Sequence, residues 1–354
     1  MKKFARKLAN IEQSQHPTLN QDESEYKDAY SNLSKSALVQ ESNIFNDKVL
    51  KEKKCIDLLN KIIFLLNQGV EFAEIEKSQV FFNVTKLFQI PQSQRNKYYQ
   101  NLRRLVYVLI KELNVSANEV FIVISCLTKD IQNNDNDVFK ANALRVLTKI
   151  IDEQFLLNVE KFLRQSVIDR SLHVQSTGVV SHIDLFKKGG ASAEVAKKSS
   201  NELQDKLFNS SDGFIQYQAL LILFDMKRGD NMGSLKLIYQ LTQKKLNSAL
   251  VKCQLVRFIK TTLFTNSAVD QKTAKLFLSF IESKMDKEDD SVMFEAAKTL
   301  CELHEVYGQV IDVEPPFQIL VELASKSSKP VNKYAALRVM NKVASHQPKL
   351  VGIC

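Results

Sequence analysis

The chain contains one amphipathic phrase in two copies. The first reads VFKANALRVLTKI from Val138, and the second reads VNKYAALRVMNKV from Val331, 193 residues later. The copies align without gaps and pair Ala143 with Ala336. Small or apolar residues recur at equivalent places along the chain, at Leu105, Ala143, Gly178, Ala219, Val256, Ala297 and Ala336. Self-similarity at a regular interval indicates a repeat architecture, which restricts the fold more than any other feature of the sequence.

The interval between these positions averages about 38.5 residues, which is room for two helices and is close to the period of HEAT and armadillo units. One such unit cannot bury its apolar face alone, so its neighbours stack on it. The sequence therefore predicts an all-α fold, an α-solenoid or superhelix of armadillo/HEAT-like helix pairs. We expect Ala143 and Ala336 to be buried where a neighbouring helix packs closely.

The rest of the chain is consistent with long helices and short turns. It has only 9 Gly and 6 Pro in 354 residues, and from about residue 35 its apolar residues recur at helical spacing. Gly69 is placed to end one helix, and Asp289 and Asp290 are placed to cap another. We divide the chain into a polar, basic N-terminal arm, residues 1–34, and a solenoid, residues 35–354.

No stretch of the sequence carries a recognisable catalytic or metal-binding motif. His304-Glu305 begins like a zinc-protease motif, but Gly308 occupies the position of the second histidine. The five cysteines are odd in number and form no CxxC pair, so we interpret them as reduced thiols of a cytosolic protein. Gly189-Gly190 is either a turn between helices or an anion cradle, and we expect the turn. We predict neither an enzyme nor a cofactor or metal site.

The net charge of +9 suits an acidic partner or anionic lipid. The first residues, MKKFARKLANI, place apolar residues on one helical face, which is typical of a membrane-surface helix or a weak transit peptide, and a charged tail is the alternative. The basic stretch QRNKYYQNLRR has the composition of a nucleic-acid contact, but we interpret it as a solvated helix surface and predict no nucleic-acid partner.

The stretch EVFIVISCLTKDI is the candidate interaction site. It is apolar at five consecutive positions, from Val120 to Ile124. A helix that buries one stripe uses Val120, Val123, Ile124, Leu127 and Ile131, which leaves Phe121 and Ile122 outside the stripe. Either adjacent repeats bury this helix on two sides, or Phe121 belongs to an exposed apolar patch that marks a partner site.

Several phrases of the chain resemble the coatomer gamma family, within the adaptin and coatomer large chains. They are KSALVQESNIFND at 35–47, FFNVTKLFQ at 81–89, LRRLVYVLIKEL at 102–113, LTKDI at 127–131 and KPVNKYAALRVMNKVASHQP at 329–348. They occur in order from about residue 31 to the end and match the amino-terminal trunk of that family. The linker SQRNKYYQNLRR is longer than the family's usual one, and the chain stops inside the trunk, as a fragment or a shortened paralogue would.

The resemblance implies a non-enzymatic coat subunit of COPI vesicles. Such a protein is cytoplasmic, lies peripherally on Golgi membranes and COPI-coated vesicles, and acts in retrograde Golgi-to-ER and intra-Golgi transport. The implied partners are the zeta, beta and delta coatomer subunits and the GTP form of the small GTPase Arf. By the same resemblance Phe121, Ile124 and Thr128 form the Arf contact row. The alternative is another helical-repeat trafficking adaptor, a clathrin-adaptor large chain or a nuclear transport receptor.

Overall fold

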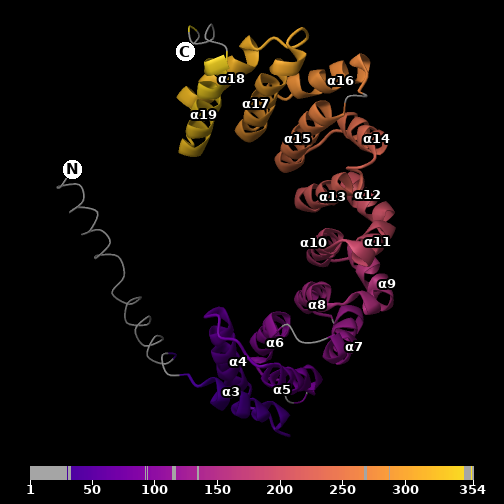
Figure 1. Cartoon of the computed structure of the whole chain (residues 1–354), viewed down its shortest axis with the longest axis vertical. Helices are drawn as coiled ribbons and strands as arrows, with labels where there is room; N and C mark the ends of the chain where they lie inside the picture. Colours follow the sequence, from indigo (N-terminus) through magenta and orange to yellow (C-terminus); the bar gives the residue numbers. More distant parts are fainter. Residues whose placement is uncertain are drawn as a thin grey trace, which may run out of the picture. The chain divides into compact units, whose positions relative to one another are not determined.

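A computed structural model describes residues 30, 33–91, 93, 95–113, 117–133, 135–266, 269–286, 288–346 and 352. Within these residues the chain forms 17 α-helices and no strand (Figure 1). The predicted all-α, helical-repeat fold is confirmed. The expected N-terminal arm, with its basic amphipathic stretch, lies almost entirely outside the described residues.

The chain divides into two compact units, residues 1–155 and 156–354. In the first unit α4 packs on α6 and α6 on α8, while α5 and α7 lie in a second row that contacts the first. Short 3-10 turns follow α3, α5 and α8. The elements are α3 (Lys35–Glu41), η1 (Ser42–Asn46), α4 (Glu52–Asn67), α5 (Glu74–Thr85), η2 (Lys86–Gln89), α6 (Tyr99–Leu113), α7 (Ala117–Asn133), α8 (Asp137–Ile150) and η4 (Glu153–Phe155).

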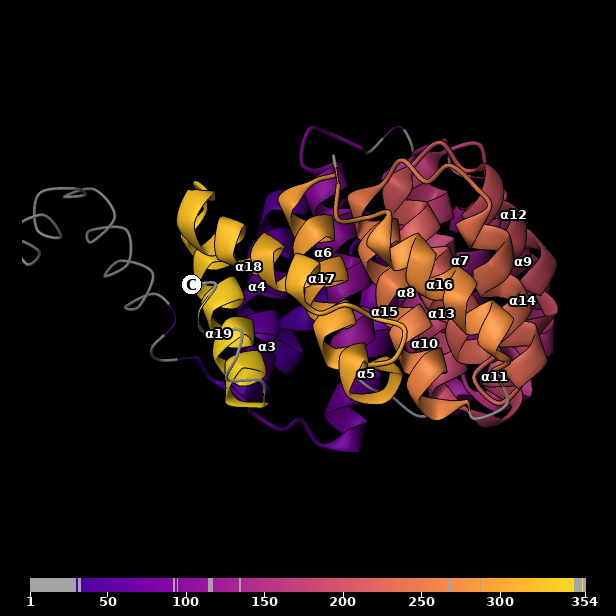
Figure 2. The same ribbon diagram turned by 90° about the horizontal axis from the view of Figure 1, so that it is seen from above.

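The second unit repeats this two-row arrangement. One row runs α10, α13, α15, α17 and α19 in order (Figure 1 and Figure 2), and the helices between them in sequence cover it from one side. The elements are α9 (Leu156–Val167), α10 (Leu172–Lys188), α11 (Gly190–Lys198), α12 (Ser200–Asn209), α13 (Gly213–Met226), α14 (Asn231–Thr242), α15 (Ala249–Thr265), α16 (Gln271–Glu282), α17 (Asp290–Tyr307), α18 (Glu314–Lys326) and α19 (Pro330–His346).

Within each unit the recurring small or apolar position lies on one row of helices, which is α6 and α8 in the first unit and α10, α13, α15, α17 and α19 in the second. Ala143 and Ala336 are 0% exposed, which confirms that they are packing positions. The equivalent residues of the other helices are also buried, with one exception. Leu105 of α6 is only partly buried, and the adjacent Val106 is 0% exposed. In α6 the buried position is therefore shifted by one residue from the alignment.

Gly178 shows why a small residue is needed in this position. A Cβ atom added there would lie 2.4 Å from the Oγ of Ser166 and 2.9 Å from the carbonyl carbon of Ser166, on α9. It would also lie 3.0 Å from the backbone nitrogen of Val167. These separations are below van der Waals contact, so α9 and α10 can pack this closely only because the residue is glycine.

One repeat departs from the predicted two helices. Between Gly178 and Ala219 the chain forms α10, α11 and α12, because a break at Ser199 divides the intervening segment into two short helices. Ser199 is buried, and its hydroxyl donates to Nε2 of His182 at 2.9 Å, while Nδ1–H of His182 donates to the carbonyl of Gly178 at 2.7 Å. The break is thus tied to the core of the repeat by a buried histidine.

The expected helix ends are present. Gly69 ends α4 with a φ of 78°, and its N–H donates to the carbonyl of Leu66 at 3.0 Å. Asp289 is the N-cap of α17, and its Oδ1 accepts the N–H of Ser291 at 3.0 Å. Gly189 has a φ of 79° and joins α10 to α11, which begins at Gly190, so the Gly-Gly pair lies at a turn between helices as predicted.

The cysteines of the described residues are free thiols. Cys55 and Cys301 are buried, and Cys126 and Cys253 are partly buried. Burial raises the pKa of Cys55 to about 11 and that of Cys301 to about 12. These thiols are protonated at neutral pH, so they are poor nucleophiles and poor metal ligands.

Candidate protein-binding site

The two apolar residues of α7 that lie outside its burial stripe are exposed. Val123 and Leu127 are 0% exposed, whereas Phe121 is 58% exposed and Ile122 is 48% exposed. Of the two interpretations of this helix, the structure therefore supports the exposed apolar patch. The ring of Phe121 contacts the ring of Phe155, with 5.7 Å between centroids, and remains open to solvent on its other side.

The three residues of the predicted contact row differ in accessibility. Phe121 is exposed, but Ile124 is 7% exposed and belongs to the core. Thr128 is partly buried, and its hydroxyl donates to the carbonyl of Ile124 at 2.9 Å. The structure thus presents Phe121 on the surface, with Ile122 and Ser125 as its exposed neighbours on α7.

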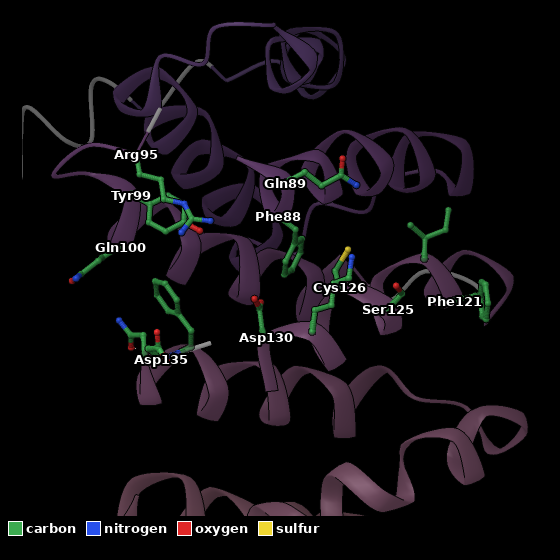
Figure 3. A pocket seen from close by; sticks show the side chains of 14 residues that line it. Phe88, Gln89, Arg95, Tyr99, Gln100, Phe121, Ser125, Cys126, Asp130 and Asp135 are labelled. Carbon is green, nitrogen blue, oxygen red and sulfur yellow. Dashed lines mark hydrogen bonds between the residues drawn. The ribbon is translucent and has the colours of Figure 1, made fainter. Parts of the chain in front are cut away.

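A groove of about 1140 Å³ runs alongside Phe121 in the first unit. Its walls come from the end of η2, the residues that precede and begin α6, one face of α7 and the start of α8. Phe121 lies at one end of the groove, and Arg95, Tyr99 and Gln100 lie at the other (Figure 3). Neither Ile124 nor Thr128 lines it.

A buried cation lies beneath this groove. Arg103 of α6 is 1% exposed, and its Nη2 donates to Oδ2 of Asp130 on α7 and to the hydroxyl of Tyr107, the latter at 3.1 Å. The Tyr107 hydroxyl in turn donates to Asp130 at 2.6 Å. Burial raises the pKa of Tyr107 far above its usual range. Asp130 also lines the groove, so this network links α6 to the wall formed by α7.

Aromatic rings surround the Arg103 guanidinium. Its central carbon lies 4.2 Å from the ring centroid of Phe88, 5.1 Å from that of Tyr107 and 5.7 Å from that of Phe139. Desolvated cation–π contacts of this kind compensate part of the cost of burying the charge. Phe88 and Phe139 also line the groove, so the same rings form its apolar floor.

The rim of the groove carries two cations. Arg95 stacks over the ring of Tyr99 at 4.4 Å, and its Nε donates to the carbonyl of Ile90 at 3.2 Å. Lys129 lies on the exposed face of α7, two turns after Phe121. Asp135 is the exposed acidic residue of the lining. The arrangement suits binding of another chain.

The described residues contain no cluster of histidine, cysteine and carboxylate side chains able to hold a metal ion. In that same part of the chain, no helix combines the length and the apolar character that crossing a bilayer requires.

Comparison with known proteins identifies the family. The sequence model of one protein family, the adaptin N-terminal region, matches residues 34–353. The chain belongs to the adaptin N-terminal region family. Among curated relatives it is 37% identical to coatomer subunit gamma-2 of Oryza sativa subsp. japonica over 333 residues, 35% identical to coatomer subunit gamma of Arabidopsis thaliana and 33% identical to coatomer subunit gamma-2 of Homo sapiens.

These matches cover 92 to 94% of this adaptin-family chain but only 35 to 36% of the relatives, in their N-terminal part. The resemblance to the coatomer gamma family is thereby confirmed. Among solved structures, human deoxyhypusine hydroxylase covers 88% of the chain at 14% identity with a TM-score of 0.31, a similarity too weak to bear on fold or function.

The Arg103–Asp130 pair of this adaptin-family chain was not predicted from the sequence. Both residues lie in phrases that carry the resemblance, LRRLVYVLIKEL and LTKDI, but they are 27 positions apart. The available signal was the register of α6, since Arg103 falls on the apolar face with Leu102 and Val106. A cation on such a face needs a buried partner, which the next helix supplies.

Proposed function

We propose that this chain is a non-enzymatic coat scaffold of COPI vesicles, acting in retrograde Golgi-to-ER and intra-Golgi transport. The observation that carries the proposal is the 37% identity with a coatomer gamma subunit over 94% of the chain. The protein acts on the cytoplasmic side of Golgi membranes and COPI-coated vesicles, to which it attaches peripherally. It uses no cofactor or metal, because its work is to present surface to other proteins.

The proposed partners are the zeta, beta and delta coatomer subunits and Arf in its GTP form. Residues 35–354 serve as the trunk that these partners contact, and residues 1–34 serve as its arm. No nucleic acid is involved. A stack of helix pairs suits this role because consecutive repeats offer one extended binding surface.

The proposed Arf contact is centred on Phe121, with Ile124 and Thr128 on the same helix. The exposure of Phe121 supports this proposal, since a 58% exposed aromatic ring loses much of its contact with water when a partner covers it. Ile124 contributes from beneath by holding α7 against the core, and Thr128 continues the row one turn further. An aromatic residue at the centre of an interface is a frequent hot spot.

The test is the affinity of Arf loaded with a non-hydrolysable GTP analogue for the Phe121→Asp variant. Loss of a hot spot worth about 2 kcal/mol predicts a dissociation constant roughly thirtyfold higher than that of the wild type. The matched control is Ile75→Asp, which removes an 83% exposed apolar side chain from α5 of the same unit. Its affinity should be unchanged.

Circular dichroism separates binding from folding in this experiment. Phe121→Asp should keep the helical content and melting temperature of the wild type, whereas Ile124→Asp should lower the melting temperature because its side chain is buried. Wild-type affinity of a folded Phe121→Asp protein for GTP-loaded Arf refutes the proposed contact.

A further inference from the structure

The groove shares only Phe121 with the proposed Arf contact, and its other lining residues have a chemistry that this contact does not use. We propose that it binds an acidic segment of a partner protein that inserts a phenylalanine side chain. The groove combines an aromatic floor with a cationic rim, and each part selects a different feature of such a segment. This binding does not depend on Arf.

The floor favours an aromatic side chain. Phe88 contacts Tyr107 edge to face with 5.8 Å between centroids, and Tyr99 contacts Phe139 in the same way at 6.0 Å. Phe88, Tyr99 and Phe139 all line the groove. Rings that are already fixed in edge-to-face pairs lose little freedom when another ring packs on them, and such contacts add to the gain from burying apolar area.

The rim favours negative charge. Arg95 and Lys129 form no ion pair with any described residue, while the carboxylate of Asp130 is already neutralised by Arg103. Asp135 is the opposing exposed charge. The side chains that a ligand meets therefore carry a net positive charge, and the N-termini of α6 and α8, which also open on the groove, add to it. A carboxylate beside the inserted ring complements this rim.

The part of the groove that runs along α7 fits a short extended segment. Phe121 and Lys129 are eight residues apart on α7, which corresponds to about 12 Å along a helix. An extended chain advances about 3.3 Å per residue, so roughly four residues span this distance. A ring near the floor and carboxylates on either side can then reach both Arg95 and Lys129.

The experiment measures fluorescence anisotropy of labelled peptides in the presence of the full chain. The test peptide has one phenylalanine flanked on each side by two aspartates, within a Gly-Ser sequence. Two control peptides carry lysines in place of the aspartates or serine in place of the phenylalanine. We expect saturable binding of the test peptide, at least tenfold weaker binding of both controls, and weaker binding of the test peptide at 300 mM than at 50 mM NaCl, because salt screens the rim charges.

Variants of the chain locate the binding. Lys129→Glu and Arg95→Glu should each weaken binding of the test peptide at least tenfold. The matched control Lys236→Glu makes the same charge change at an exposed position of α14 and should leave the affinity unchanged. The variants count as folded when their melting temperatures equal that of the wild type within 2 °C. This tolerance corresponds to about 1 kcal/mol or less in the free energy of unfolding.

Three results overturn the proposal. The first is no saturable binding of the test peptide at chain concentrations up to the millimolar range. The second is binding of the lysine peptide as tight as that of the test peptide. The third is an equal loss of affinity for the test peptide in the Lys236→Glu and Lys129→Glu variants. The last result assigns any binding to net charge alone.

Discussion

The close packing of α9 on α10 makes Gly178→Ala an informative substitution. In an open helix interior this change is stabilising by roughly 0.5–1 kcal/mol, because alanine has the higher helix propensity. Here the added methyl group would lie 2.4 Å from Ser166 Oγ and within 3.0 Å of two backbone atoms of α9. The hydroxyl can rotate away, but the backbone atoms cannot move without shifting the whole helix. Overpacking of this kind costs typically 1–3 kcal/mol.

The net expectation for Gly178→Ala is a loss of about 1–2 kcal/mol in the free energy of unfolding, after the gain in helix propensity is subtracted. For a unit of this size, each kcal/mol lowers the melting temperature by roughly 2–4 °C. We therefore expect the melting temperature, measured by circular dichroism at 222 nm, to decrease by about 2–8 °C.

Two controls make the measurement specific. Gly229→Ala places a methyl group where no atom lies within 4 Å, so it should be neutral or slightly stabilising. In the background of Ser166→Ala, the methyl group at Gly178 loses its closest contact but keeps the backbone contacts, so its cost should fall without vanishing. If Gly178→Ala stabilises the protein as much as Gly229→Ala does, the claim that α9 and α10 pack too closely for a Cβ atom at Gly178 is wrong.

Two further predictions concern buried polar groups. Burial lowers the pKa of His182 below its ordinary value of 6.5, so the unfolded chain binds more protons, and the stability from this group should be complete above pH 6.5 and decrease below it. His182→Gln should flatten this pH dependence of the free energy of unfolding, measured by urea titration at pH 7.5 and 5.5. Asp130→Ala leaves Arg103 buried without its carboxylate and should lower the free energy of unfolding, measured with urea, by about 3–5 kcal/mol. The double variant Arg103→Met/Asp130→Ala should regain most of this loss. A loss below about 1 kcal/mol contradicts the buried pair.

The sequence pattern was sufficient for the features that depend on local periodicity. The spacing of small residues identified Ala143 and Ala336 as buried packing positions, since burial in a helical repeat follows the repeat itself. The stripe of α7 distinguished Phe121, outside it, from Val123, inside it. The same stripe included Ile124, so its burial was predictable, although the resemblance placed it in a contact row.

Features that depend on contacts between helices were not predictable in this way. The division into α11 and α12 rests on the meeting of Ser199 with His182, 17 residues earlier, and no periodic pattern encodes it. The groove is lined by four elements of the first unit. Its floor depends on the contact between Arg103 and Asp130 on the next helix. A sequence pattern indicates which face of a helix is buried but not which side chains of other helices meet there.

Affinity purification of the tagged chain from cells of its source organism tests the proposed coat function most directly. The account predicts that the zeta, beta and delta coatomer subunits co-purify, and that they remain bound in the Phe121→Asp variant because Phe121 belongs to the proposed contact with Arf. Recovery of clathrin or of nuclear transport cargo, with none of the three coatomer subunits, contradicts it.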